Sequence, residues 1–517
     1  MKKLLKKPLY LSILSVVLLS MPWVVNGLWF TILAGFVPLF FIQKMSKHPL
    51  KWAAATFFAW IMITCWWVSM ATLLALIMVP LVGLVFTFLP WAAFHKTTKN
   101  NCTEPVKWML FITIWICAEA AYTYQDISFP WLTLGNAPAP FFVQWYSSTG
   151  IFGGSLWILI SNILIFKSLE KYSKTKALTA ACIILIPMLL STIIYVKRGS
   201  ELKDGEKIEV AVIQPNIDPY TEKFKGLNRY EQVKIMLAEA AKAPSNTDYY
   251  ILPETAIGGS LWLHNIDKNL SINQLKGFLE NRNPKATFVT GASTLRLQDS
   301  SEPTNYNTRT TQDFRYVSYN TALWVDTTDI TNYYHKGKLV CGVEILPYPE
   351  VFSTLDNLFS IDLGGLSGKM GRSTERNVYN DIGTAICYEG IYGEFFTEYV
   401  QQGAQLIFII SNDGWWGNTA GHKHLLRYSR LRAIETSRWI ARSANTGISA
   451  VIDPRGGVQQ ELTWDKRGIL ISEVHKRDNV TPYVQWGDLV TRLSAYVMAL
   501  LLFYRLSQHF RKKIISL

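Results

Sequence analysis

Long apolar segments constrain the fold of this chain more than any other feature of its sequence. A helix needs about 20 predominantly apolar residues to cross a bilayer, and eight segments come close to that length. Seven lie before residue 197 and one lies near the C-terminus, whereas residues 200 to 480 alternate strand and helix patterns with ordinary charge. The predicted spans are 9–25, 27–43, 52–68, 72–94, 108–123, 151–166, 177–196 and 489–505.

The sequence therefore predicts three parts. Residues 1–199 form a membrane domain with seven transmembrane helices, residues 200–482 form an exported domain, and residues 483–517 form a last transmembrane helix with a short tail. A cleaved signal peptide would also begin with lysines and an apolar core. No small-residue cleavage site precedes the second apolar run, which favours retention of the first segment.

Positive charge is confined to one set of connections between the predicted spans. The net charge is +13, and the connections near Asn26, near Ser69 and from 124 to 150 carry no Lys or Arg. By the positive-inside rule both termini are cytoplasmic and the large domain lies outside the membrane. Membrane topology thus accounts for the charge, and no nucleic-acid partner is expected. The basic residues that mark the inner side are Lys2, Lys3, Lys6, Lys7, Lys44, Lys47, Lys51, Lys96, Lys99, Lys107, Lys167, Lys171, Lys174, Lys176, Arg511, Lys512 and Lys513.

Strand patterns alternate with helix patterns along the exported domain. This alternation is typical of layered α/β folds, and several direct connections between strands indicate two facing sheets. We therefore expect a four-layer αββα sandwich. Strands are predicted at 208–214, 249–252, 287–291, 320–326, 330–336, 382–389, 406–411, 446–453 and 468–475, and helices at 226–243, 271–282, 391–403 and 423–440. Between them, residues 355–380 lack periodicity and are predicted to form a mobile lid.

Three residues with complementary chemistry each follow a predicted strand. Glu254 comes after Tyr249 to Leu252, Lys336 closes the hairpin that begins at Asn320, and Cys387 ends an apolar run. A thiol attacks well only as the thiolate, so it needs a base for its proton and a cation for the charge that develops. We expect the three side chains to converge at one sheet edge. A simple ion pair between Glu254 and Lys336, without catalysis, is the plainer alternative.

Cysteine usage leaves a second alternative open. Of six cysteines, only Cys341 and Cys387 fall in the exported domain, and two cysteines in an oxidising compartment are first suspected of forming a disulfide. Such a bond would block the thiolate. The sequence alone does not decide between a free nucleophile and a structural disulfide.

The motifs around these residues resemble those of the apolipoprotein N-acyltransferase family, the membrane branch of the nitrilase superfamily, over nearly the whole chain. Tyr334-His335-Lys336 followed by Glu344 resembles the lysine loop of that family, and Ile386-Cys387-Tyr388-Glu389 resembles its nucleophile turn. Further matching segments are Pro253-Glu254-Thr255-Ala256, Ser411-Asn412-Asp413-Gly414-Trp415-Trp416-Gly417, Arg430-Leu431-Arg432-Ala433, Asn445-Thr446-Gly447-Ile448, and Phe129-Pro130-Trp131 with Gly135 in the membrane domain.

The resemblance implies a nitrilase-like exported domain that transfers an acyl chain in two steps. A phospholipid would acylate Cys387, and the α-amino group of an S-diacylglyceryl-cysteine apolipoprotein would then take the acyl chain. It implies Glu254 as general base and acid and Lys336 as oxyanion stabiliser. It also implies a bacterial inner-membrane protein, expected to be a monomer and to need no cofactor. Glu344, Tyr388 and Glu389 would support the site, and Phe224, Asn412, Trp415 and Trp416 are candidates for substrate binding.

The sequence departs from the family pattern at two places. The family's lysine loop usually reads Leu-Val-Pro-Phe-Gly-Glu, whereas this chain has Leu339-Val340-Cys341-Gly342-Val343-Glu344. The spacing from Lys336 to Glu344 is kept, which favours a working loop. Phe224 stands nearest to a family tryptophan that helps to bind lipid, so the aromatic character is retained without the indole N–H.

Two other functions remain open at this point. A membrane-anchored nitrilase-type amidohydrolase would use the same three residues on a small amide, with water as the acceptor. A membrane scaffold would need no chemistry at all, but none of the three residues is missing. His422 and His424 lack a third metal ligand at suitable spacing, so no metal is expected. Glu119, within a predicted span, is a candidate for either function or buried structure.

Overall fold

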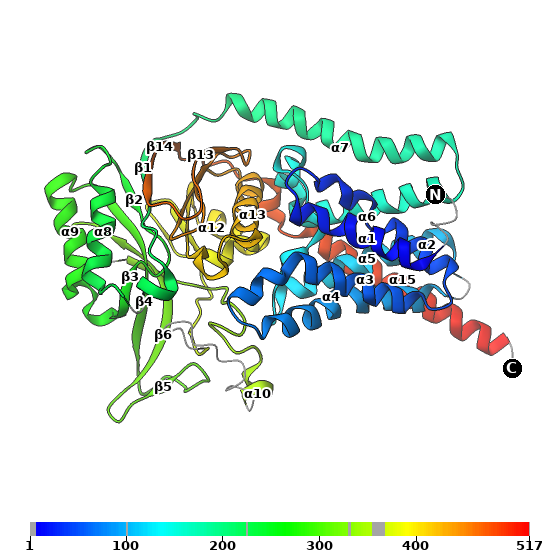
Figure 1. Cartoon of the computed structure of the whole chain (residues 1–517), viewed down its shortest axis with the longest axis horizontal. Helices are drawn as coiled ribbons and strands as arrows, with labels where there is room; N and C mark the ends of the chain where they lie inside the picture. Colours follow the sequence, from blue (N-terminus) through cyan, green and yellow to red (C-terminus); the bar gives the residue numbers. More distant parts are fainter. Residues whose placement is uncertain (1–6, 100–101, 224–225, 329–331, 354–367, 516–517) are drawn as a thin grey trace. The chain divides into compact units, whose positions relative to one another are not determined.

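The computed structural model describes residues 7–99, 102–223, 226–328, 332–353 and 368–515. The chain divides into two compact units. One, the membrane unit, comprises residues 1–194 and 486–517, and the other, the catalytic unit, comprises residues 195–485. Figure 1 shows the helices of the first and the strands of the second.

The described residues of the membrane unit are helical. Among the described residues, six helical segments are long and apolar enough to cross a membrane, and they fall where spans were predicted from residue 52 onwards. The spans predicted at 9–25 and 27–43 fall on shorter apolar segments, so the total of eight stays a prediction. The helices are α1 (Pro8–Val24), η2 (Trp29–Ala34), α2 (Val37–Met45), α3 (Pro49–Cys65), η3 (Trp66–Met70), α4 (Ala75–Thr98), α5 (Glu104–Tyr124), α6 (Tyr146–Glu170), α7 (Lys174–Ser200) and α15 (Leu489–Ile515), with short turns η4 (Pro130–Leu132), η5 (Leu134–Asn136) and η6 (Pro140–Val143) between α5 and α6.

Aromatic side chains fill the centre of the membrane unit. Phe36 and Phe40 lie against Trp91 at ring-centroid distances of 6.2 and 5.6 Å, and Phe36 also meets the edge of Trp115 at 4.7 Å. Lipid offers no hydrophobic drive for helices to associate, so close packing of this kind and hydrogen bonds between helices must hold them together. One such bond runs from the Phe36 backbone N–H to the Asn162 side chain, at 2.7 Å.

The catalytic unit is built on two sheets. The eight-stranded sheet has the order β14-β1-β2-β4-β6-β5, with β3 beside β4 and β7 beside β6, and the six-stranded sheet has the order β13-β12-β11-β10-β9-β8. Its strands are β1 (Lys207–Gln214), β2 (Tyr249–Ile251), β3 (Ile257–Trp262), β4 (Thr287–Gln298), β5 (Arg309–Thr310), β6 (Arg315–Val325), β7 (Asn332–His335), β8 (Val378–Tyr379), β9 (Ile382–Ile386), β10 (Leu406–Ser411), β11 (Ile440–Ala444), β12 (Ser449–Ile452), β13 (Val458–Leu462) and β14 (Gly468–His475).

Helices cover both sheets of the catalytic unit. α8 (Arg229–Ala240) and α9 (Leu270–Arg282) bury Met236 and Leu275 against Tyr250 and Phe288 of the eight-stranded sheet. α12 (Gly393–Gln401) and α13 (Ala420–Thr436) contact β9 and β12 of the other sheet, while β1 contacts β11 between the sheets. Figure 1 shows α8 and α9 on one side of the strands and α12 and α13 on the other. These are the contacts that the predicted αββα arrangement requires.

Five of the fourteen described strands, β3, β5, β8, β11 and β13, were not predicted from the sequence. The clearest case is β11. The predicted helix at 423–440 ends at Thr436, and Ile440–Ala444 forms β11, parallel to β10. The strand was missed because Arg442 and Ser443 interrupt its apolar pattern. Both residues are buried, and the Arg442 guanidinium is paired with the Asp413 carboxylate at 2.8 Å. The charge of Arg442, which in the sequence suggested a solvent-exposed helix, is therefore neutralised inside the sheet.

The predicted lid at 355–380 is only partly described. Residues 354–367 lie outside the described residues. From residue 368 onwards the prediction of a mobile lid is wrong, because Met370, Gly371 and Ser373 donate backbone hydrogen bonds to Glu344, Ser318 and Lys336 and the segment ends in β8. This stretch therefore anchors the lysine loop.

Candidate active site

The three predicted catalytic residues each follow a strand, but the strands belong to two sheets. Glu254 follows β2 and Lys336 follows β7, both in the eight-stranded sheet, whereas Cys387 follows β9 in the six-stranded sheet. The expectation of a single sheet edge was therefore wrong. The site forms between facing sheets, and a run of strands in sequence does not reveal which sheet each strand joins.

Lys336 is the centre of the site. Its ammonium Nζ lies 3.0 Å from the Glu254 carboxylate and 3.0 Å from that of Glu344, and its side chain is 1% exposed. An ammonium has three N–H donors, so two carboxylates leave one donor for a substrate oxygen. Glu344 also accepts the Val340 backbone N–H at 2.8 Å. The loop whose sequence departs from the family pattern thus still brings Glu344 to Lys336.

Two asparagines hold Glu254 in place. The Asn320 side-chain amide on β6 donates to Glu254 Oε1 at 2.7 Å and to Glu344 at 2.8 Å. The Asn412 backbone N–H after β10 donates to Glu254 Oε2 at 3.0 Å. Both carboxylate oxygens are therefore oriented. Sequence patterns did not suggest Asn320, because a polar residue in the middle of a buried strand has no motif of its own.

The charges in the site act on one another. Burial opposes ionisation of Glu254, but Lys336, Asn320 and a second ammonium, that of Lys223, together hold the pKa of Glu254 below its usual range. Burial likewise opposes the charge on Lys336, yet the Glu254 and Glu344 carboxylates raise its pKa. Burial and the nearby Glu254 carboxylate raise the pKa of the Cys387 thiol, against the pull of Lys336. At rest the site thus holds an ionised Glu254 beside a neutral thiol, as a general base requires.

Cys387 sits in a strained turn directly after β9. Its φ is +49°, a left-handed conformation that non-glycine residues adopt at a cost. A short 3₁₀ helix, η10 (Cys387–Ile391), begins at this residue, and Cys387 remains partly exposed. The turn presents the thiol at the end of the strand while its neighbours are buried.

Glu389 links the nucleophile turn to the lysine loop. Its fully buried carboxylate accepts the backbone N–H of Ile386 at 2.7 Å and that of Gly337 at 2.6 Å. The hydroxyls of Tyr334 and Tyr399 donate to it at 2.7 and 3.1 Å. Glu389 is therefore a buried link between the two segments and not a solvated loop charge.

The remaining candidates lie around this centre. Tyr388 is buried, with its ring 5.4 Å from that of Tyr392. Trp415 packs against a small apolar cluster of Leu339, Ile345 and Met370, and its ring meets that of Tyr220 at 5.5 Å. Trp416 is partly exposed. Asn412 is buried. Phe224 lies outside the described residues.

The disulfide alternative does not hold. None of the six cysteines forms a disulfide, Cys341 and Cys387 included. The thiol of Cys387 is therefore available for chemistry. His422 is buried with its ring 4.7 Å from that of Trp464, and no group of His, Cys, Asp and Glu among the residues with described positions could hold a metal ion.

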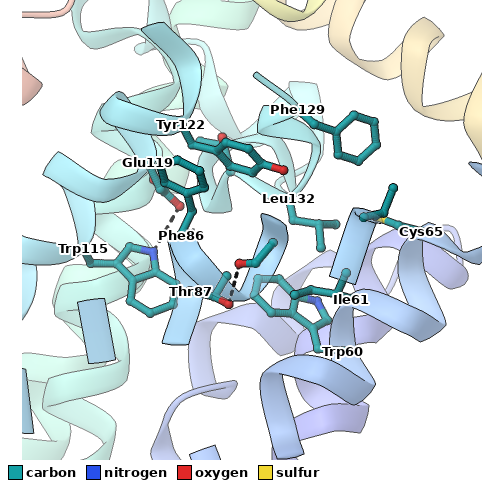
Figure 2. Close-up of a pocket in the computed structure, with 13 residues that line it drawn as sticks. Trp60, Ile61, Cys65, Phe86, Thr87, Trp115, Glu119, Tyr122, Phe129 and Leu132 are labelled. Atoms are coloured by element: carbon teal, nitrogen blue, oxygen red, sulfur yellow. Dashed lines mark hydrogen bonds between the residues drawn. The ribbon is translucent and has the colours of Figure 1, made fainter. Parts of the chain in front are cut away.

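The membrane unit has a small, mostly apolar cavity of its own, at Glu119 (Figure 2). Glu119 Oε1 accepts the Trp115 indole N–H at 3.1 Å and the Leu134 backbone N–H at 2.8 Å. Its Oε2 has no hydrogen-bond partner among the described residues and lines a cavity of about 30 Å³. Glu119 thus ties the connection after α5 to that helix, which supports a structural role. The cavity walls include Trp60, Ile61, Cys65, Phe86, Thr87, Tyr122, Phe129 and Leu132.

The chain is similar to known proteins along both units. Residues 209–478 match the carbon-nitrogen hydrolase family, and residues 15–164 match the apolipoprotein N-acyltransferase N-terminal domain. The chain is 27% identical to an apolipoprotein N-acyltransferase from Chlorobaculum tepidum over 95% of both chains, and 25% identical to one from Vibrio cholerae over 76% of this chain and 72% of that one. An amidase of the nitrilase superfamily from Nesterenkonia is similar at a TM-score of 0.36 and 16% identity, over 55% of this chain and 95% of the amidase. The match to the carbon-nitrogen hydrolase family covers more than half of the sequence. The chain therefore belongs to that family.

Proposed function

We propose that this protein is a phospholipid:apolipoprotein N-acyltransferase that works through a thioester on Cys387. The observation that carries the proposal is the buried Glu254, Lys336 and Cys387 site in a chain whose other unit consists of apolar helices. Relatives that bear this name match along both units. A small-amide hydrolase would use the same chemistry but would have no need of the membrane helices.

In the first half-reaction a phospholipid ester acylates the cysteine. Glu254 takes the proton from Cys387 Sγ, and the sulfur attacks the ester carbonyl carbon. The free N–H of the Lys336 ammonium stabilises the oxyanion, an interaction typically worth about 3–4 kcal/mol in the transition state. The carbon–oxygen bond then breaks, Glu254 returns its proton to the departing lysophospholipid oxygen, and the acyl chain stays on sulfur.

In the second half-reaction an amine takes the acyl chain. The α-amino group of the S-diacylglyceryl-cysteine apolipoprotein attacks the thioester carbonyl, and Glu254 accepts a proton from the nitrogen. Lys336 again stabilises the oxyanion while the carbon–sulfur bond breaks. Glu254 gives the proton to the sulfur, which restores the thiol and leaves an amide on the product.

The other roles follow from the same contacts. Glu344 orients Lys336, Glu389 and Tyr388 support the turn of Cys387, and Trp415 with its apolar neighbours offers a surface to an acyl chain. Phe224, Asn412 and Trp416 stay candidates for substrate binding. The proposed protein is a monomer of the bacterial inner membrane with both termini in the cytoplasm and its domain from about 200 to 482 outside it, as the distribution of Lys and Arg indicates.

The intact mass of the purified chain after incubation with phospholipid tests the proposal. We expect a mass gain of one acyl chain that hydroxylamine removes and that Cys387→Ala lacks. Cys341→Ala is the matched control, because Cys341 is also a cysteine outside any disulfide and lies in the same unit. It should retain the gain. Addition of a diacylglyceryl peptide should then remove the acyl chain from the protein and place it on the peptide amine.

Two results would count against the proposal. If Cys387→Ala still carried the adduct, another residue would be the nucleophile. If the wild-type chain formed no adduct with phospholipid but released ammonia from small amides in a manner that depends on Cys387, the amidohydrolase would replace the acyltransferase.

A further inference from the structure

A second lysine, which the sequence patterns did not suggest, lies next to the proposed base. Lys223 ends the helical turn η7 (Pro219–Lys223) after β1, and its side chain is 4% exposed. Its ammonium Nζ donates to the Glu254 backbone carbonyl at 3.0 Å and to the Thr255 hydroxyl at 2.7 Å. A buried lysine is costly unless its charge is compensated, so its position beside the backbone of Glu254 calls for an explanation.

The segment that Lys223 holds is strained. Thr255 has a φ of +48°, and Gly291 on β4 lies so close that a Cβ there would be 2.3 Å from the Thr255 backbone nitrogen. Residues persist in such conformations only where their surroundings impose them. The hydrogen bond to the Thr255 hydroxyl and the bond to the preceding carbonyl are two such constraints, and both come from Lys223.

The charges of the site balance only when Lys223 is included. Glu254 and Glu344 carry two negative charges, and Lys336 supplies one positive charge. The other charged or titratable groups that face this set are the Cys387 thiol, neutral at rest, and Asp413, which is paired with Arg442. Lys223 supplies the second positive charge, and its pull contributes to the lowered pKa of Glu254. Burial in turn lowers the pKa of the Lys223 ammonium to about 8, against the pull of Glu254.

We propose that Lys223 is a positioning residue that keeps Glu254 ionised and correctly turned as the base for Cys387. It does so from the backbone side of Glu254, through the Glu254 carbonyl and the Thr255 hydroxyl. This proposal rests on one part of the proposed function, the assignment of Glu254 as the base. Lys336 also favours the ionised Glu254, but in the proposed mechanism it binds the oxyanion as well, whereas Lys223 acts on Glu254 alone.

The sign of the effect follows from the charge. A nearby positive charge favours the ionised carboxylate, so its removal raises the pKa of Glu254. Glu254 then stays protonated, and inactive as a base, up to a higher pH. The acid limb of any reaction that needs Glu254 as a base should therefore shift to higher pH.

The test measures the rate at which iodoacetamide alkylates Cys387 between about pH 3 and about pH 7, a range in which Lys223 keeps its proton. The full-length chain in detergent is used, and peptide mass mapping separates Cys387 from the other cysteines. No lipid or acceptor is needed. We expect Lys223→Gln, which keeps a hydrogen-bond donor, and Lys223→Met to shift the midpoint upward equally, and Lys223→Arg to restore it at least in part. Thr255→Val, which loses the hydroxyl but keeps the charge, should slow the reaction without shifting its midpoint.

The possible outcomes separate the two proposals. An unshifted midpoint in Lys223→Gln, with a changed profile in Glu254→Gln, would overturn the role of Lys223 and leave the base in place. An unchanged profile in both variants would overturn Glu254 as the base as well. A shift in Thr255→Val equal to that in Lys223→Gln would assign the effect to the strained turn and would overturn the role of the charge.

Discussion

At the scale of single residues, the sequence revealed the groups that react but not the groups that hold them. Glu254, Lys336 and Cys387 could be found because each ends an apolar run, and a polar residue in that position stands out. Asn320 and Lys223 could not, since one lies inside a strand and the other in an irregular turn, where polar residues are common. Their importance comes from distances across the fold, which a pattern along the chain does not contain.

Asn320 gives the sharpest prediction at this scale. Its amide donates to the carboxylates of Glu254 and Glu344 at once. Asn320→Asp would therefore place a third carboxyl group beside these two without changing the size of the side chain. Like charges at this distance cannot all ionise, and protons would be taken up by the site. We expect thioester formation at pH 7 to fall at least tenfold, roughly the effect of one lost buried hydrogen bond to a charged group. The measurement is the initial rate of acyl-enzyme formation by mass spectrometry.

Asn377→Asp is the control for that change. Asn377 is exposed and donates only to the Tyr333 carbonyl, away from the site. Its rate should stay within about twofold of wild type, as for most surface substitutions. Equal rates in Asn320→Asp and wild type would mean that the carboxylates do not depend on the shared amide.

At the scale of elements, the predicted helices and strands were mostly confirmed, and the error was in how they combine. The hairpin of β6 and β7 and the strand before Cys387 lie where the alternation of apolar residues predicted them. β11 was hidden by Arg442, because a buried arginine on a strand looks like a solvated helix until its partner Asp413 is known. The assignment of β9 to the second sheet likewise depends on pairing with β10, which is not local in sequence.

The side chain of Glu389 links the two sheets at the site. Because its carboxylate accepts N–H and O–H donors from both the turn of Cys387 and the lysine loop, Glu389→Gln would turn one accepting oxygen into a donor that faces other donors. Breaking a buried charged network of this kind costs about 3 kcal/mol or more. We expect a lower thermal midpoint and slower alkylation of Cys387, measured on the same preparation. Glu398→Gln removes a partly exposed ion pair with Arg376 and should change the midpoint little. Similar losses in both variants would mean that Glu389 has no special role in the turn.

At the scale of the whole molecule, the sequence separated the chain into a membrane part and a catalytic part because apolar length and charge are properties of whole segments. What it could not settle is whether the first two apolar segments cross the bilayer. The first segment forms α1, which has 17 residues, and the second forms η2 and α2, which together reach from Trp29 to Met45. Each of these two segments is shorter than the six helical segments that are long enough to cross a membrane. Buried serines in α1 add to the ambiguity, since Ser12 pairs with Thr56 on α3 at 2.7 Å.

The two topologies differ in where Asn26 lies. With eight spans, Asn26 is outside and Lys47 is inside; with six, both are inside, and Ser69 is outside in either case. In a chain whose native cysteines are replaced by Ala, we expect a membrane-impermeant maleimide added to spheroplasts to label Asn26→Cys and Ser69→Cys but to reach Lys47→Cys only after lysis. Protection of Asn26→Cys together with labelling of Ser69→Cys would establish six spans. The positive-inside rule favours eight, because four lysines precede the first segment, three follow the second, and the connection between the two segments has none. A helix of 17 residues can still span a thin or locally compressed bilayer, at a modest cost in free energy for each ångström of mismatch.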